Sequence, residues 1–316
     1  MIDATLRAFV LGDVNVDISL AVDHFPSEGG DAQAHDRTLG SGGGGLNAAV
    51  ALRALGVDVS LVGCVGTDPL SDIAVDAATE RGVDLARLQR TDTVPTGTCV
   101  LITTPRGERT LLSHRGANAM LSGTCVDAAD FSEAGLLLVF GYALLASPQR
   151  EATLSVIECA RQHGCTTAMD IGLAVARHPT LLLDVLPSID LVMMNEQEVL
   201  AFTSCMNVED ALDQLFATGA RTIVVKLGSR GCLVADDQGR KHFAGESVRA
   251  VDTTACGDAF SAVFAWMWAS EKQVADCARV ANLMGAMTAC RRGAAESVPS
   301  TGRFQDALRT GANDAR

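Results

Sequence analysis

The sequence predicts an α/β fold, with a mostly parallel central sheet covered by helices on both faces and a small separate sheet beside it. Short apolar runs alternate with longer helical patterns along most of the 316 residues, the order expected of parallel strands joined by helices. Hydrophobic residues make up 48% of the chain, which is ample for a packed core. Two polar segments, residues 18–39 and 96–114, interrupt the alternation.

Six short apolar runs are predicted as buried strands. They cover residues 9–14, 59–65, 136–140, 166–170, 191–194 and 222–226. The predicted helices cover residues 46–55, 70–81, 148–163, 196–204, 208–218 and 259–269. In such sheets ligands bind outside the carboxyl ends of the strands, so residues that follow a strand are the first candidates for function.

The two interrupting segments are expected to form a lid over the site. The second alternates apolar and polar residues on both sides of the sequence PRGE at 105–108, which is a hairpin signal. The predicted organisation is therefore an α/β core of residues 1–17, 40–95 and 115–316 and a β lid of residues 18–39 and 96–114.

Composition excludes several classes of partner. The net charge of −13 argues against nucleic acid, because phosphate backbones are bound by basic patches and none is visible. No apolar run is long enough to span a bilayer, so no membrane partner is expected. The ten cysteines show no CxxC or paired Cys/His spacing, so we expect reduced thiols in a cytoplasmic protein and no zinc site.

The most informative segment is DTTACGD at residues 252–258, which runs directly into an apolar helical pattern. Unpaired backbone N–H groups and the positive end of the helix dipole attract anions at such a helix start. The carboxylate of Asp258 is either an ordinary helix cap or, beside a bound polyphosphate, a base that takes a proton from an attacking hydroxyl.

A second candidate is GSGGGGLN at residues 40–47, a glycine run that opens a helix. It contains the spacing GxGxxG, but a dinucleotide fold places that motif directly after the first strand, and here it lies far beyond it. Its glycines let a ligand approach the backbone and Asn47 can bond hydroxyls, while a flexible turn is the alternative. No Walker A, His-Arg-Asp or Asp-Phe-Gly sequence occurs, which excludes P-loop and eukaryotic-type protein kinases.

Together these segments resemble the ribokinase/phosphofructokinase-B family of carbohydrate kinases over nearly the whole chain. The matching motifs occur in the family's order: GDVNVD at 12–17, the glycine segment at 42–56, NEQE at 195–198, KLGSRG at 226–231 and DTTACGDAF at 252–260. The resemblance implies a ribokinase-like three-layer sandwich with a β lid. It also implies ATP-dependent transfer of the γ-phosphoryl group to a hydroxyl of a small sugar or sugar derivative.

The resemblance assigns roles to residues around both glycine-containing motifs. Asp258 would be the base, and the N–H groups of Ala255, Cys256, Gly257 and Asp258 would form an anion hole for the transferred group. The residues that would bind the substrate are Asn15, Asp17, Gly42, Gly43 and Asn47. For Asp17 the alternative is a turn residue at a strand end.

The resemblance also implies a nucleotide site and the cofactors ATP and Mg²⁺. The implied nucleotide contacts are Asn195, Lys226, Gly228, Gly231 and Asn282, the last near the adenine. Asn195 and Glu198 lie three residues apart on one helical face, where the resemblance implies that they organise Mg²⁺ and its waters. For Asn195 and Glu198 the alternative is an ordinary helix start with an exposed acid. For KLGSRG at 226–231 it is a turn between two strands.

Family members often bind a monovalent cation at positions that match Asp252, Thr254, Arg291, Gly293 and Ser297. Carbonyl groups supply most of those ligands, so the sequence leaves activation by K⁺ open. The chain departs from the family at residues 255–256, where it has Ala-Cys in place of the common Gly-Ala. A small side chain should be tolerated there, because the anion hole uses backbone N–H groups. The thiol of Cys256 is either oxidisable or inert and packed.

The acceptor stays open, because a pentose or hexose, a keto-deoxy sugar acid and a nucleoside are all compatible with the polar residues. An aromatic content of 4% favours a sugar, although Phe25 and Phe140 could stack on a base. Arg115 is either a contact for an acidic substrate or a surface residue. A non-catalytic sugar or nucleotide sensor is the alternative to a kinase, and the presence of Asp258 argues against it.

Lids of this family often pair between two subunits, so a homodimer is expected. The alternating apolar residues Val100, Ile102, Leu111 and Leu112 would supply one face of that contact. The lid would also keep water away from ATP during transfer.

Overall fold

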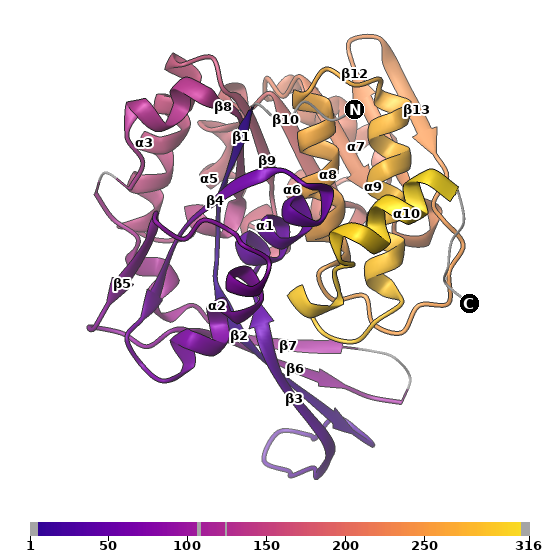
Figure 1. The fold of residues 1–316 in the computed structure, drawn as a ribbon. Coiled ribbons are helices and arrows are strands. Elements are labelled where there is room, and N and C mark those ends of the chain that lie inside the picture. The colour runs from indigo at the N-terminus through magenta and orange to yellow at the C-terminus, as the bar shows by residue number, and fades with distance from the viewer. Residues whose placement is uncertain (1–5, 106–108, 124, 311–316) are drawn as a thin grey trace.

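Nine strands form one large sheet in the computed structural model, which describes residues 6–105, 109–123 and 125–310 (Figure 1). The strand order is β13-β12-β11-β10-β9-β8-β1-β4-β5. All pairs from β11 to β5 are parallel, and only β12 and β13 add antiparallel pairs at one edge. The predicted mostly parallel central sheet is confirmed.

The strands of the large sheet are β1 (Arg7–Leu11), β4 (Asp58–Gly66), β5 (Leu88–Thr91), β8 (Ala134–Phe140), β9 (Thr166–Asp170), β10 (Leu191–Asn195), β11 (Thr222–Lys226), β12 (Cys232–Asp236) and β13 (Gly239–Phe243). Both faces of the central strands are buried. In β1, Ala8 and Val10 belong to one apolar core and Phe9 and Leu11 to the other. Burial on both faces explains why the parallel strands are continuous apolar runs without alternation.

Helices cover the two faces in separate layers. One core is closed by α1 (Gly44–Leu55), α2 (Leu70–Glu80), α8 (Cys256–Ala269), α9 (Val274–Ala289) and α10 (Thr301–Thr310). The other is closed by α3 (Gln149–Gln162), α4 (Leu173–Ala176), α5 (Thr180–Leu183), α6 (Glu196–Thr203) and α7 (Val208–Ala217). In Figure 1, α1, α8, α9 and α10 lie together on one side of the sheet. The expected three-layer arrangement is confirmed.

Seven strands and α-helices of the body were not predicted from the apolar pattern: β5, β12, β13, α4, α5, α9 and α10. In α9 the buried side includes Asn282 and Thr288, which interrupt the apolar stripe that would have revealed the helix. Strand β13 is largely exposed, so it carries no apolar run.

A small sheet projects from one end of the body, with strand order β3-β2-β6-β7 (Figure 1). Its strands are β2 (Asn15–Val22), β3 (Ala34–Gly42), β6 (Gly97–Thr103) and β7 (Arg109–His114). The pair β2–β6 is parallel and the two outer pairs are antiparallel. The separate small sheet is thus confirmed. Of the turn predicted at residues 105–108, residues 106–108 lie outside the described residues. The division of the chain into core and lid segments stays a prediction.

The small sheet corrects one expectation about its apolar residues. Leu111 lines a hollow beneath the sheet together with its cross-strand partner Leu101, whereas Leu112 lies opposite Val100 in the next pair. Because adjacent residues of a strand point to opposite faces, Leu111 and Leu112 cannot supply one contact face.

Candidate active site

Two hollows meet at the carboxyl ends of the central strands. The lid pocket, about 410 Å³, lies between the small sheet, the start of α1 and the start of α8. The α8–α9 pocket, about 490 Å³, lies between residues 245–250 and those two helices. The residues that line both pockets are Asn195, Lys226, Thr253 and Gly257. The two hollows therefore join in front of the first turn of α8.

Asp258 lies in that first turn and lines the lid pocket. Its Oδ2 accepts a hydrogen bond of 2.8 Å from Asn47 Nδ2. Burial and the nearby Asp170 raise the pKa of Asp258, against opposing effects of Asn47 and Lys226. A carboxyl group with a raised pKa, facing a pocket, is suited to accept a proton.

The start of α8 is open to a ligand. Within the described residues no side-chain hydrogen bond caps this helix, whose N-cap residue is Ala255. The first backbone bond of α8 runs from Ala259 N to Ala255 O at 2.9 Å, so the N–H groups of residues 256–258 precede the helical ladder. The Cys256 thiol donates to the carbonyls of Asp252 and Thr254, at 3.8 and 3.7 Å. These N–H groups can bind an anion at the junction of the pockets.

Ala255 has a left-handed backbone, with φ of 61°. Glycine adopts this conformation without cost, while alanine pays about 1 kcal/mol. The departure from the family pattern is therefore tolerated sterically, as expected for a small side chain, but it stores strain at the helix start.

Asn195 and Glu198 form a closed helix start at α6. Asn195 Oδ1 accepts a bond of 2.9 Å from Glu198 N, and Glu198 Oε2 accepts one of 2.7 Å from Asn195 N. Glu198 is only 6% exposed, so the alternative of an exposed acid is wrong. Burial raises the pKa of Glu198 to about 7, with Lys226 opposing and Asp170 adding to the effect.

Four of the five residues expected to bind substrate gather at the lid pocket, and Gly42 is not among its lining residues. Asn15, Asp17, Gly43 and Asn47 line it. Asn15 Oδ1 accepts a bond of 2.8 Å from Asn118 Nδ2. This places amide and carboxylate groups where hydroxyl groups of a ligand could bind.

Gly42 and Gly43 lie so close to neighbouring atoms that a side chain would not fit at either position. A Cβ atom on Gly42 would lie 2.2 Å from Asp17 Cγ, and one on Gly43 would lie 2.3 Å from Asp13 O. Gly43 also has a φ of 93°, which side chains rarely permit. The run is therefore structurally constrained, and the alternative of a flexible turn is wrong.

Asp17 faces an acidic neighbour that the sequence did not reveal. The pKa of Asp17 is raised to about 7. Burial is the largest cause, and repulsion from the charges of Glu296, Asp258 and Asp252 adds to it. Glu296 Oε1 accepts a bond of 2.6 Å from Ser41 N and lines a small hollow together with Asp17. No sequence signal could have found Glu296, because it lies some 280 residues from Asp17 in the chain.

Arg115 is held inside the site and is not a surface residue. Its Nη2 donates to Asp13 Oδ1 at 2.7 Å and to Gln149 Oε1 at 2.6 Å. Asp13 and Arg115 also line the lid pocket, as does Tyr142. The signal that could have found Asp13 and Arg115 is their position, since each directly follows a strand or its turn.

The residues expected at the nucleotide line the α8–α9 pocket: Asn195, Lys226, Gly228, Gly231 and Asn282. A Cβ atom on Gly231, which has a φ of 89°, would lie 2.1 Å from Phe243 O. Asn282 Nδ2 donates to Ala244 O at 3.0 Å across the wall of the pocket. Lys226 Nζ binds Asp170 Oδ2 at 2.5 Å, and Asp170 is a further residue that the sequence did not single out although it ends a predicted strand.

The five residues expected at a monovalent cation are brought together only in part. Asp252 Oδ1 accepts from Thr254 N at 2.9 Å, and its Oδ2 accepts from Gly293 N at 3.2 Å. The hydroxyl of Ser297 donates to Ala294 O at 2.6 Å. Burial, and then repulsion from Arg291, lower the pKa of Arg81, which places Arg291 near the end of α2.

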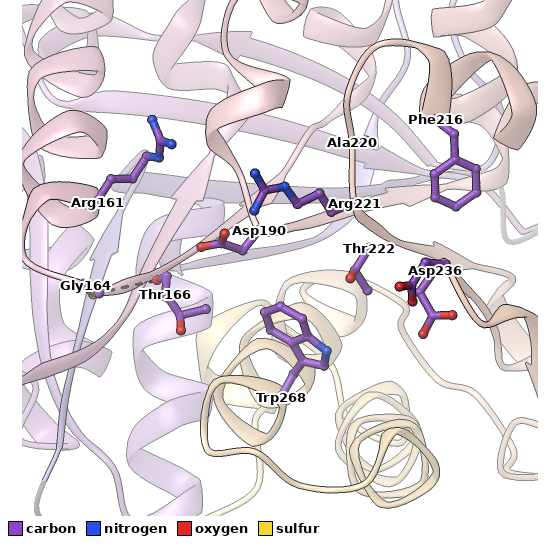
Figure 2. A pocket seen from close by; sticks show the side chains of 12 residues that line it. Arg161, Gly164, Thr166, Asp190, Phe216, Ala220, Arg221, Thr222, Asp236 and Trp268 are labelled. Atoms are coloured by element: carbon purple, nitrogen blue, oxygen red, sulfur yellow. Dashed lines mark hydrogen bonds between the residues drawn. The ribbon is translucent and has the colours of Figure 1, made fainter.

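A larger hollow, about 900 Å³, lies at the opposite edge of the sheet (Figure 2). It contains Thr166 and Thr222, at the amino ends of β9 and β11, and Trp268 near the end of α8. None of the residues singled out from the sequence lines it. Because parallel sheets bind ligands at the carboxyl ends of their strands, this hollow is not the candidate active site.

The described residues contain no cluster of three or more His, Cys, Asp or Glu side chains placed to hold a metal ion. Mg²⁺ keeps several waters and binds phosphates together with one or two carboxylates, so Glu198 beside the pocket junction fits its needs. Among the helices of the described part of the chain, none has the length and apolar character to cross a bilayer.

Comparison with known proteins agrees with this architecture. The chain is 27% identical over 302 residues to a ribokinase of Staphylococcus aureus, covering 93% of this chain and 97% of that protein. The structure of Arabidopsis thaliana ribokinase complexed with ribose and ATP matches with a TM-score of 0.82 and 23% identity, covering 96% and 99% of the two chains. Adenosine kinase of Sinorhizobium meliloti matches with a TM-score of 0.86 and 23% identity, covering 98% and 100%.

The model of the pfkB family of carbohydrate kinases matches residues 6–301, nearly the whole chain. The matched range includes the strands and helices that form the two pockets and their junction at the start of α8. The chain belongs to the pfkB family of carbohydrate kinases.

Proposed function

We propose that the protein transfers the γ-phosphoryl group of ATP to a hydroxyl group of a small sugar, with Asp258 as the base. The observation that carries this proposal is the position of Asp258, which faces the lid pocket at the point where that pocket meets the α8–α9 pocket. Sugar would occupy the first pocket and ATP the second. The acceptor hydroxyl would give its proton to Asp258 while its oxygen attacks the γ-phosphorus.

The open start of α8 supports the role of an anion hole. The N–H groups of Ala255, Cys256, Gly257 and Asp258 lie where negative charge develops on the transferred group. Asn195 and Glu198 would hold Mg²⁺ through its waters, and the ion would neutralise phosphate charge. A monovalent cation beside Asp252, Thr254 and Gly293 stays part of the proposal, with a contribution from the carbonyl groups of that loop.

A sugar is favoured over a nucleoside by the side chains that line the lid pocket. Phe25 is 47% exposed and lies outside the pocket lining, so it offers no stacking surface there. Phe140 and Tyr142 line the pocket, but Phe140 is only 6% exposed, and a Cβ atom on Gly44 would lie 2.5 Å from its ring, so this ring is packed against the glycine run. The similarity to adenosine kinase shows that the fold alone does not separate the two acceptor classes.

Pairing of two lids would explain the exposed apolar side chains of the small sheet. Leu39 is 41% exposed and Leu112 is 57% exposed, on the two edge strands β3 and β7. We therefore propose a homodimer through the lid, which would also keep water from the lid pocket. A monomer in light scattering at micromolar concentration would contradict it.

The test is a panel of pentoses, hexoses, keto-deoxy sugar acids and nucleosides, each with ATP and Mg²⁺, with and without K⁺. We expect ADP release together with a phosphorylated sugar seen by mass spectrometry, and little release with nucleosides. Phosphorylation of nucleosides alone would establish the alternative. Release of ADP without any phosphorylated acceptor, or no turnover with the whole panel, would refute the kinase proposal.

A further inference from the structure

Lys226 is the only charged residue among the four that line both pockets. It is the last residue of β11, so the carboxyl edge of the sheet places its side chain at the junction. A phosphoryl group that passes from one pocket to the other has to cross this junction. The ammonium group therefore lies beside the path of transfer.

Two partners hold the Lys226 ammonium in place. Nζ lies 2.5 Å from Asp170 Oδ2 and 3.1 Å from Ser261 Oγ, and Asp170 is 5% exposed. An ammonium group has three N–H donors, so these two bonds leave one for a ligand. Because the side chain is already ordered, binding a phosphoryl oxygen costs it little further conformational entropy.

The Lys226 side chain carries a positive charge at neutral pH. Burial acts to lower its pKa, but the carboxylates of Asp170, Glu198 and Asp258 raise the pKa overall. Lys226 and Asp258 stabilise each other's charge. Burial and Asp170 raise the pKa of Asp258, and Lys226 lowers it. The residue is thus a permanent hydrogen-bond donor beside the base.

The ammonium group also faces the start of α8. A Cβ atom built on Gly257 would lie 3.6 Å from Lys226 Nζ. The backbone N–H groups of the helix start and the ammonium therefore border the same small volume. Partial and full positive charges converge there, as required for a group on which negative charge develops.

We propose that Lys226 is a catalytic residue that contacts the phosphoryl group during transfer, and that Asp170 is the positioning residue that holds it; this rests on the kinase function proposed above. The acceptor hydroxyl gives its proton to Asp258, its oxygen forms the new bond to the γ-phosphorus, and the bond to the oxygen of ADP breaks. Lys226 keeps its proton and donates it in a hydrogen bond to a phosphoryl oxygen. A contact that strengthens as charge develops raises kcat, whereas a contact with bound ATP alone changes KM.

The first test uses Lys226→Met, which keeps the aliphatic stem and removes the charge. We expect kcat to fall about 10²-fold, as for loss of one donor in an anion hole, with KM for ATP changed by less than about threefold. Lys241→Ala, on the exposed strand β13, is the matched control and should keep the activity of the wild type. Asp170→Asn should lower kcat about tenfold, because the ammonium is present but less well held.

The second test is chemical rescue, which a purely structural role would not permit. Lys226→Ala leaves space for a small amine, and propylamine should restore kcat at least about tenfold in this variant and not in the wild type or in Asp170→Asn. Equal melting temperatures and a retained Kd for ATP would show that the variant is folded. Absence of rescue in the folded variant overturns the proposal.

Should Lys226→Ala fail to fold, the kinetics of Lys226→Met decide alone. A kcat within about threefold of the wild type, or a loss confined to KM for ATP, overturns the catalytic role. These outcomes are distinct from failure of the kinase function, in which the wild type itself would phosphorylate no acceptor.

Discussion

The starts of α6 and α8 look alike in sequence and differ in use. Each has an acid at the third helical position, Glu198 in α6 and Asp258 in α8. In α6 the N-cap is Asn195, whose side chain bonds the helix and whose own N–H is bonded by Glu198. In α8 the N-cap is Ala255, whose side chain cannot accept a bond from the first N–H groups, and Asp258 accepts a bond from Asn47.

This comparison teaches that the N-cap residue decides whether a helix start is structural or available to a ligand. An asparagine satisfies the first N–H groups and turns the acid inward. An alanine cannot cap the helix with its side chain, so the first turn of α8 faces the junction of the two pockets, at the cost of stability. The five predictions below test and extend this comparison, from the largest expected effect to the smallest.

The two acids should differ most in their effect on turnover. Asp258→Asn is expected to lower kcat about 10³-fold, because it removes the base. Glu198→Gln should keep the capping arrangement and mainly weaken Mg²⁺ binding, about tenfold, since glutamine serves equally well in a capping box. Steady-state kinetics with varied Mg²⁺ measures both. Equal losses of kcat in the two variants would contradict the division of roles.

The charge of Asp258 should also affect the ionisation of Asp17, whose pKa is raised to about 7. Only the ionised carboxylate accepts hydroxyl bonds at both oxygens, so Kd for the sugar should fall about tenfold as pH rises from about 6 to 8. Asp258→Asn should move this midpoint to lower pH, whereas Glu198→Gln should not, because Glu198 is not among the causes of the shift. Calorimetric titration of the sugar measures the midpoint.

The same pKa predicts a change in stability with pH. The folded form of Asp17 binds its proton more tightly than the unfolded form, whose pKa is near 3.8, so its contribution to the free energy of unfolding falls as pH rises from about 4 to 7. Asp17→Asn should remove this slope. An unchanged slope in denaturant titrations of the variant would show that other groups carry it.

Breaking the closed start of α6 should destabilise the fold. Asn195→Ala is expected to lower the free energy of unfolding by about 2 kcal/mol and the melting temperature by about 3 °C. Asn207→Ala, at the exposed start of α7, removes a similar cap and should cost about 1 kcal/mol. The difference is expected because Asn195→Ala also removes the bond that Asn195 Nδ2 donates to Oε1 of the buried Glu198. Equal costs would show that burial of Glu198 adds nothing.

Relieving the strained start of α8 should have the smallest effect, and in the opposite direction. Ala255→Gly is expected to raise the free energy of unfolding by about 0.5–1 kcal/mol and the melting temperature by about 1 °C. Ser204→Gly, at the end of α6, is the matched control, since Ser204 has a similar φ of 58°. Both variants should keep kcat within about twofold. A lower melting temperature for Ala255→Gly alone would mean that the alanine methyl group contributes packing that outweighs the strain.

Much of the fold was predictable because burial leaves a strong pattern. Strands β1, β8 and β11 are apolar on both faces, so their runs were visible with ends shifted by a few residues. The edge strand β13 was not visible, because an exposed edge strand needs no apolar run.

Some residues of the candidate site could be predicted from the sequence and others could not. Asp258, Asn195 and Glu198 belong to short motifs whose geometry depends on adjacent residues, so their arrangement could be expected from the sequence. Arg115 and Glu296 belong to no motif; the position of Arg115 after a strand made it a candidate, whereas nothing in the sequence pointed to Glu296. Their roles depend on which distant segment they meet.

By itself the sequence determined the alternation of strands and helices, the two helix starts and the glycine run, because each depends on residues within about one or two turns of one another. Only the tertiary structure decided that Lys226 meets Asp170, that Arg115 bridges Asp13 and Gln149, and that Leu111 and Leu112 face opposite ways. The reason is physical: strand order and side-chain direction are set by the packing of whole layers, and many orders of the same strands satisfy the same local pattern.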